Sequence, residues 1–345
     1  MKQSAIVICP GRGTYNKPEL GYLKKHHSDK ADFINSIDAY RKGQGQVPIS
    51  ELDEMPAYKM STHTRGDNAS ALIYACTVAD FMSINRDKYD IVGITGNSMG
   101  WYLALACGNS LAGEDGIHVV NLMGTTMHND AEGGQVIYPL VDVNWVEDAE
   151  LIANLKEAVK TAKSDPRVEI YSSIKLGGMV IIAANDLGMK RLLKLLPQAQ
   201  ERYPFSLPNH GAFHSPLMTG ISKAAKQSLK PDLFGKPDVP LIDGRGHIWQ
   251  PYSTDIAALQ DYTLGHQILE TYDYTKAIEV ALKEFAPEKL IVLGPGNTLG
   301  APTAQCLIRN TWDGINNKKS FIDGQAKDPF ILSMGMEDQR ALVLG

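Results

Sequence analysis

The sequence YDIVGITGNSMGWYLALAC, residues 89–107, is the most informative stretch of this chain. Its first seven residues, Tyr89 to Thr95, are largely apolar and predict a buried strand of a parallel sheet. The Ala- and Leu-rich residues from Trp101 to Cys107 predict a helix. Between the two lies G-x-S-x-G at residues 96–100, a pattern that is informative when it joins a strand to a helix. The stretch therefore predicts a nucleophile elbow.

The glycines of this motif have a steric purpose. A strand that turns sharply into a helix leaves no room for side chains two residues before and after the nucleophile, and Gly96 and Gly100 remove the collision. Ser98 would then stand above the sheet at the helix N-terminus. There the amide of Met99 can donate to an oxyanion, helped by the helix dipole. We predict Ser98 as the nucleophile.

The composition bounds the protein class. The chain has 345 residues, of which 43% are hydrophobic and 21% charged, with a net charge of −5. This is a globular composition with ample chain to bury a core. The mild acidity argues against nucleic acid as a partner, because phosphate binding needs a basic face. No apolar stretch approaches the ~20 residues that span a bilayer, so we expect no membrane association and a cytoplasmic location.

The cysteines and histidines show no metal-ligand spacing. None of the four cysteines forms a C-x-x-C pair. Cys9, Cys76 and Cys107 stand in apolar surroundings and predict reduced thiols in the core. We therefore expect no bound metal.

Further segments extend the parallel sheet away from the elbow. Ala5 to Cys9 and Lys289 to Leu293 are short apolar runs typical of buried strands. Ala69 to Met82 is apolar at helical spacing and predicts a buried helix, whereas residues 14–66 are polar and predict loops with a helix or two. The expected fold class is α/β, a hydrolase-like core with a mostly parallel sheet.

The middle of the chain has a different order of predicted elements. It predicts strands and helices in the order β-α-β-β-α-β, the split βαβ pattern of a ferredoxin-like unit. The segments are Gln135–Val141, Val146–Lys163, Val168–Ser172, Met179–Ala184, Leu187–Leu196 and Tyr203–Leu207. We predict a small inserted ferredoxin-like α+β subdomain at residues 132–205, with the hydrolase-like core formed by residues 1–131 and 206–345.

A serine nucleophile needs a base, and nine histidines are candidates. His26 and His27 lie in a polar, Lys-flanked run and are interpreted as surface residues. His214 follows a predicted strand within a loop of small residues and proline, at residues 211–218, where catalytic groups usually lie. We predict His214 as the base.

Taken together, the motifs resemble the malonyl-CoA:acyl-carrier-protein transacylase family, which includes the acyltransferase domains of fatty acid and polyketide synthases. The sequence ICPGRG, Ile8–Gly13, matches the family's F-P-G-Q-G opening, and GNSMG, Gly96–Gly100, matches its G-H-S-L-G elbow. The sequence AFHSPLM, Ala212–Met218, matches its histidine loop, and LGPGNTL, Leu293–Leu299, matches its E-V-G-P-G-x-x-L segment. The four segments occur in the family's order. A further segment from Gln267 resembles the family's Q-L segment before its final helix. The likeness covers nearly the whole chain.

The resemblance implies a Ser-His dyad. His214 would take the proton from Ser98, and the backbone carbonyl of Gln267 would orient the imidazole. The amides of Met99 and Arg12 would form the oxyanion hole. Acyl-CoA would acylate the serine, and the phosphopantetheine thiol of an acyl carrier protein would then take the acyl group. No metal or organic cofactor is implied, because CoA and phosphopantetheine are substrates.

The chain departs from the family at the expected substrate-binding positions, Asn97, Arg12 and Gly124. The first replaces a histidine and the second a glutamine. Malonyl-specific members also carry an arginine that pairs with the malonyl carboxylate, and Gly124 falls closest to that position. A glycine cannot replace a bidentate arginine. Either the acyl group is uncharged, which we favour from the sequence, or Arg12 supplies the charge from another side of the pocket.

Other functions remain open. The same dyad becomes a thioester hydrolase if water reaches the acyl-enzyme before a thiol does. A non-catalytic subunit that docks a carrier protein would not need the intact dyad. A lipase or esterase would place its histidine near the C-terminus, after an acidic residue, and the position of His214 far before residue 345 weakens that interpretation. A Rossmann nucleotide site is rejected, because Asn16 stands where the third glycine would be required.

Overall fold

The computed structural model describes residues 1–345, and its core is a six-stranded sheet in the order β11-β10-β1-β2-β7-β8. All neighbouring pairs are parallel except the β7–β8 pair at one edge. The strands are β1 (Gln3–Cys9), β2 (Tyr89–Gly96), β7 (Leu241–Ile242), β8 (Ile248–Trp249), β10 (Lys289–Val292) and β11 (Ile331–Ser333). The predicted mostly parallel sheet is confirmed, with its three longest strands where the apolar runs indicate them.

Helices flank this sheet. The buried helix predicted from residue 69 is α5 (Gly66–Ser83), which packs against α7 (Asp115–Asp130) and the elbow helix α6 (Gly100–Cys107). Residues 14–66 are more helical than expected, because they hold four helices rather than one or two. These are α1 (Tyr22–His26), α2 (Ala31–Gly43), α3 (Ile49–Asp53) and α4 (Met60–His63). Three of them have only four or five residues, too short for a periodic pattern to reveal.

The remaining helices of the core follow the histidine loop. They are α10 (Thr219–Ser228), α11 (Ile256–Asp261), α12 (Gln267–Leu269), α13 (Tyr274–Phe285), α14 (Gly300–Arg309), α15 (Lys318–Lys327) and α16 (Glu337–Leu344). A π-helical turn, Tyr262–His266, joins α11 to α12. No helix of the chain is both long and apolar enough to cross a membrane.

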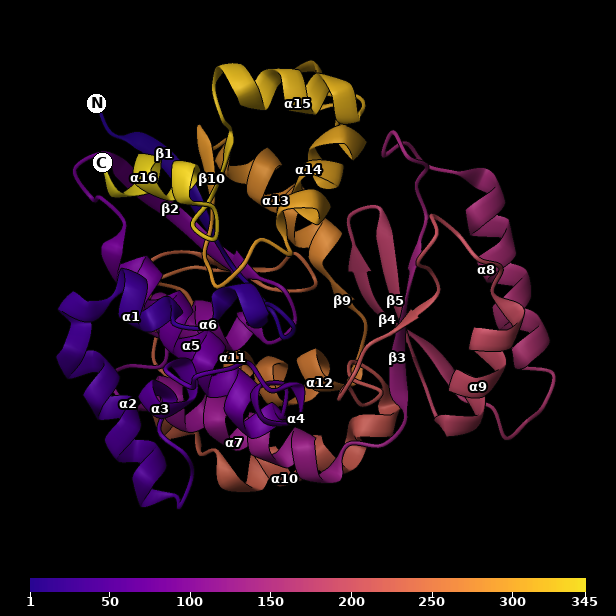
Figure 1. Cartoon of the computed structure of the whole chain (residues 1–345), viewed down its shortest axis with the longest axis horizontal. Coiled ribbons are helices and arrows are strands. Elements are labelled where there is room, and N and C mark those ends of the chain that lie inside the picture. The colour runs from indigo at the N-terminus through magenta and orange to yellow at the C-terminus, as the bar shows by residue number, and fades with distance from the viewer.

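A second, five-stranded sheet has the order β6-β3-β5-β4-β9. The β-α-β-β-α-β order predicted for the middle of the chain is confirmed by β3 (Gly134–Pro139), α8 (Ala149–Ala162), β4 (Ile170–Leu176), β5 (Met179–Ala184), α9 (Asp186–Leu195) and β6 (Phe205–Ser206). Figure 1 shows α8 and α9 on the side of this sheet that faces away from the main body. The fifth strand, β9 (Tyr272–Asp273), comes from the core and pairs in parallel with β4. The boundaries at residues 132 and 205 stay a prediction.

The interpretation of His26 and His27 as surface residues is wrong. The His27 side chain is fully buried, and its Nε2 lies 2.9 Å from Oδ1 of Asp80 on α5. Arg340 of α16 reaches the same carboxylate at 2.7 Å, and both partners of that ion pair are buried. The His26 side chain is only 12% exposed. A polar, Lys-flanked run can be buried when a distant carboxylate and guanidinium satisfy it.

Candidate active site

The predicted nucleophile lies at a strained turn between β2 and α6. Ser98 has φ of 56°, a left-handed conformation that is unusual for a residue other than glycine. A side chain at Gly96 would overlap the backbone of Gly100, and one at Gly100 would overlap the carbonyl of Cys9. Glycine is therefore required at both positions, as the G-x-S-x-G pattern predicts.

The structure brings Ser98, His214 and Gln267 together in one chain of hydrogen bonds. Ser98 Oγ lies 2.7 Å from His214 Nε2, and His214 Nδ1 lies 2.6 Å from the backbone oxygen of Gln267. Because a carbonyl can only accept, Nδ1 carries the proton and donates it to Gln267. Nε2 is then the free acceptor that faces the serine hydroxyl.

The environment keeps the imidazole neutral. Burial lowers the pKa of His214 to about 4, and the hydrogen bond to the Gln267 carbonyl opposes this shift only in part. At neutral pH the ring is therefore unprotonated and able to accept a proton. His214 has φ of 55°, a second left-handed residue at the same site.

The side chain of Gln267 adds a clamp that sequence reasoning missed. Its Oε1 accepts a hydrogen bond of 2.8 Å from the hydroxyl of Tyr102 on α6, and its Nε2 donates to the backbone oxygen of Ser98 at 3.1 Å. One residue thus holds the imidazole through its main chain and the elbow through its side chain. Gln267 directly follows the π-helical turn, a feature often found at functional sites.

A second chain of hydrogen bonds supports the histidine loop from the five-stranded sheet. His210 Nδ1 lies 2.8 Å from Gln135 Oε1, Gln135 Nε2 donates to Ser173 Oγ at 2.7 Å, and Ser173 Oγ donates to the carbonyl of Phe213 at 2.8 Å. Burial and the positive charge of Arg12 lower the pKa of His210 to about 3. His210 was not singled out from the sequence, where it looks like any loop histidine.

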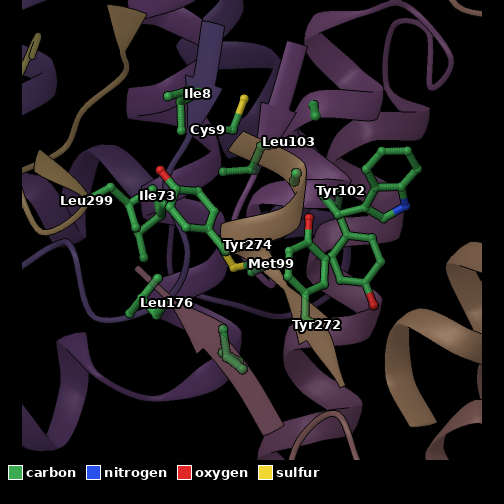
Figure 2. Packing of buried hydrophobic residues seen from close by; sticks show 14 of the residues in the cluster. Ile8, Cys9, Ile73, Met99, Tyr102, Leu103, Leu176, Tyr272, Tyr274 and Leu299 are labelled. Atoms are coloured by element: carbon green, nitrogen blue, oxygen red, sulfur yellow. The ribbon is translucent and has the colours of Figure 1, made fainter. Parts of the chain in front are cut away.

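The two backbone amides that we predict to form the oxyanion hole are free. Neither Met99 N nor Arg12 N donates a hydrogen bond within the chain. The loop after β1 lies close to the elbow, since a side chain at Gly11 would come within 2.7 Å of the carbonyl of Asn97. Figure 2 shows the buried side chains of Met99, Tyr102 and Tyr272 in this region, and the Tyr272 hydroxyl donates to the carbonyl of Gly96 at 2.7 Å.

The three predicted substrate-binding residues differ in their surroundings. Asn97 is mostly buried, and its side-chain oxygen accepts no hydrogen bond from the chain. Gly124 lies where α7 crosses α5, and a side chain there would come within 2.6 Å of both the carbonyl of Gly66 and the hydroxyl of Ser70. The structure therefore gives Gly124 a role in helix packing.

Arg12 extends from the loop after β1 toward the histidine loop. Its Nη2 donates to the carbonyls of Thr64 and Asn209, both at 3.2 Å. The guanidinium carbon lies 5.6 Å from the centre of the Phe213 ring. Burial lowers the pKa of Arg12 to about 10, which leaves it charged at neutral pH.

No three His, Cys, Asp or Glu side chains are grouped so as to hold a metal ion, and all four cysteines are buried and free. A cleft of about 600 Å³ is lined by residues that include Gln3, Lys289 and Trp312. It lies at the amino ends of β1 and β10, whereas Ser98 follows the carboxyl end of β2. Catalytic groups of open α/β sheets gather at the carboxyl ends, so the cleft is unrelated to the predicted dyad.

Comparisons with known proteins agree with the motifs. The sequence matches no protein-family model. It is 24% identical over 334 residues to a protein of Haemophilus influenzae named malonyl CoA-acyl carrier protein transacylase, an alignment that covers 93% of this chain and 97% of the relative. A second relative of that name, from Buchnera aphidicola, is 23% identical and covers 66% of this chain.

The fold is similar to that of solved transacylases. The malonyl-CoA:ACP transacylase of Synechocystis superposes with a TM-score of 0.75 at 16% identity and covers 99% of this chain. A malonyl-transacylase solved in complex with a type II polyketide synthase acyl-carrier protein superposes with a TM-score of 0.71 at 16% identity. The resemblance to the malonyl-CoA:acyl-carrier-protein transacylase family is thus confirmed, in sequence and in fold.

Proposed function

We propose that this chain is an acyltransferase that moves an acyl group from coenzyme A to the phosphopantetheine thiol of an acyl carrier protein. The observation that carries the proposal is the chain of hydrogen bonds from Ser98 through His214 to the Gln267 carbonyl, at 2.7 and 2.6 Å. The similarity to malonyl CoA-acyl carrier protein transacylases supports the same reaction class.

In the first half-reaction the serine becomes acylated. Ser98 Oγ attacks the thioester carbonyl carbon while its proton passes to His214 Nε2. The carbonyl oxygen gains a negative charge and is held by the amides of Met99 and Arg12, which are worth about 3 kcal/mol each in typical oxyanion holes. The carbon–sulfur bond then breaks, and the imidazolium returns its proton to the CoA sulfur. The products are acyl-Ser98 and free CoA thiol.

The low pKa of His214 suits its role as the proton acceptor in these steps. A neutral imidazole is ready to accept the proton at pH 7. The imidazolium that forms is stabilised by the adjacent oxyanion and by its hydrogen bond to the Gln267 carbonyl, which opposes the effect of burial. The positive charge on the base and the negative charge on the substrate therefore appear and disappear together.

In the second half-reaction the carrier protein is the acceptor. Its thiol gives a proton to His214 Nε2 and its sulfur attacks the ester carbonyl. The carbon–oxygen bond to Ser98 breaks and the proton returns to Oγ. No residue of this scheme requires a metal or organic cofactor, since CoA and phosphopantetheine both enter as substrates.

The experiment that tests the proposal follows the fate of the acyl group. Acyl-enzyme prepared from labelled acyl-CoA is divided between buffer and buffer with holo-carrier protein, and label on carrier protein and in free acid is counted. We expect transfer to the carrier protein to outpace hydrolysis. Free acid released at the same rate in both portions would instead identify a thioester hydrolase that uses the same dyad.

A further inference from the structure

Arg12, in the loop after β1 that lies close to the elbow, has a positively charged side chain with no acidic partner. It forms no salt bridge, and the carboxylate whose charge acts on it, Asp67, is paired with Arg65 at 3.1 Å. Only Nη2 is used, by two backbone carbonyls at 3.2 Å, the long end of the hydrogen-bond range. Nε and Nη1 make no hydrogen bond within the chain. The Nε–H and Nη1–H groups of the guanidinium are therefore available to a ligand.

Two buried arginines of the chain show how such charges are normally satisfied. Arg340 pairs with the Asp80 carboxylate at 2.7 Å. Arg41 uses all three nitrogens on four oxygens at 2.7–2.8 Å. Taking a cation out of water is costly unless it is paired or fully hydrogen-bonded. Arg12 is only partly buried, but it meets neither condition, which points to an anionic ligand.

The position of Arg12 limits which anion it can reach. Its backbone amide is one of the two proposed oxyanion donors, so its guanidinium lies within one arginine side chain of the thioester carbonyl. A carboxylate one carbon beyond that carbonyl falls in this range. The phosphates of CoA are separated from the sulfur by the whole pantetheine arm. The free N–H groups of a charged guanidinium also form strong, charge-assisted hydrogen bonds with a carboxylate.

The site on α7 cannot supply the charge instead. Gly124 packs against α5, where a side chain would lie within 2.6 Å of both Gly66 O and Ser70 Oγ. An arginine at residue 124 would have no room without separating the two helices.

We infer that Arg12 is a specificity-determining residue that binds a free carboxylate on the acyl group, so that the site selects carboxyacyl thioesters over uncharged ones. This inference rests on the proposed acyl transfer through Ser98. From the sequence we favoured an uncharged acyl group, because the family's arginine is missing. The inference reverses that preference, because Arg12 in the loop after β1 supplies the positive charge instead.

The test is a comparison of acylation rates for matched donors. Wild type, Arg12→Gln and Arg12→Lys are each mixed with malonyl-CoA or acetyl-CoA, and acyl-enzyme is followed by intact-protein mass spectrometry. Arg167→Gln is the control, since Arg167 is an exposed arginine paired with Asp165 on the small subdomain. Thermal unfolding of each variant checks that it is folded.

We expect the wild type to prefer malonyl-CoA. Arg12→Gln keeps the backbone amide but lowers the malonyl-to-acetyl rate ratio about 10- to 150-fold, the range for losing a hydrogen bond to a charged group. Arg12→Lys retains the charge but not the guanidinium donors, so its malonyl-to-acetyl ratio should lie between those of the wild type and Arg12→Gln. Arg167→Gln keeps the wild-type ratio.

Phosphate-free donors separate the two possible anions. Malonyl and acetyl thioesters of N-acetylcysteamine lack the CoA phosphates, and we expect the same drop in the ratio with them. A drop seen only with CoA donors would assign Arg12 to a phosphate and overturn the inference. So would an equal loss for malonyl and acetyl donors, or a wild type acylated only by acetyl-CoA. Those results leave acyl transfer intact, whereas no acylation of Ser98 by any donor contradicts the proposed function itself.

Discussion

Replacing Tyr102 by phenylalanine tests whether the Gln267 clamp positions the base. The change removes only a hydroxyl, which donates to Gln267 Oε1 at 2.8 Å. Both side chains are almost fully buried, at 1% and 2% exposure, so water cannot replace the lost donor. A buried acceptor left unpaired costs about 1–3 kcal/mol of unfolding free energy. The freed Gln267 side chain also holds the Ser98 carbonyl less firmly.

The effect on catalysis is expected to exceed what stability alone explains. A positioned general base contributes about 10²–10⁴-fold to the reaction rate. We expect Tyr102→Phe to lower the rate of acyl-enzyme formation about tenfold. The substrate concentration at half-maximal rate stays near the wild-type value, because no contact to the acyl donor is removed. The assay is CoA release at saturating donor, with urea unfolding measured on the same samples.

Tyr274→Phe is the matched control. Tyr274 is also fully buried, and its hydroxyl bonds to Thr303 Oγ1 at 2.6 Å rather than to the dyad or Gln267. We expect a similar loss of stability and a wild-type acylation rate. If Tyr102→Phe and Tyr274→Phe lose equal stability and both acylate Ser98 within twofold of the wild type, the clamp does not position His214 and the reasoning is refuted.

Four further predictions rest on the same geometry. Because burial lowers the pKa of His214 to about 4, the acylation rate should stay level from pH 8 to about pH 5 and fall below it; a midpoint near 6.5 in the pH–rate profile would contradict this. The unfolded chain takes up this proton first, so urea midpoints should decrease as pH falls from about 6.5 to about 4, and a flat profile would argue against a buried neutral imidazole. Gly100→Ala should lose about 1–3 kcal/mol or more in urea unfolding, since the new methyl group overlaps the Cys9 carbonyl; a wild-type midpoint would show that the elbow relaxes freely. Asp80→Asn should lose about 3–5 kcal/mol, because Arg340 is left without its buried carboxylate, and the malonyl-to-acetyl ratio of the remaining folded protein should not change.

The elbow and the base could be predicted because their requirements are local. Gly96 and Gly100 mark a turn whose crowding is set within five residues, and the strand and helix around them follow from short-range patterns. His214 was identified by its loop and by family resemblance. The parallel sheet followed from apolar runs that need no partner to be recognised.

The Gln267 clamp was not predictable in this way. The side chain of Gln267 meets Tyr102 across 165 residues and Ser98 across 169, and nothing near either residue signals the contact. The burial of His27 depends likewise on Asp80, 53 residues later, and on Arg340, 313 residues later. Long-range polar pairing overrides the local polarity of a sequence, so a Lys-flanked histidine can lie in the core.

The state of Arg12 also needed the structure. From the sequence, an arginine in place of the family's glutamine could have faced solvent. The structure shows that Arg12 lacks a carboxylate partner and that two carbonyls bind only its Nη2. Both observations depend on loops around residues 64 and 209, which no sequence pattern placed beside it.

The most direct test of the account is the covalent state of Ser98. Wild type and Ser98→Ala are mixed with malonyl-CoA and acetyl-CoA, quenched, and examined by intact-protein and peptide mass spectrometry. We predict a single acyl adduct on the peptide that contains Ser98, with release of one CoA, and no adduct on Ser98→Ala. An adduct that survives in Ser98→Ala, or a wild type that none of these donors acylates, would contradict it.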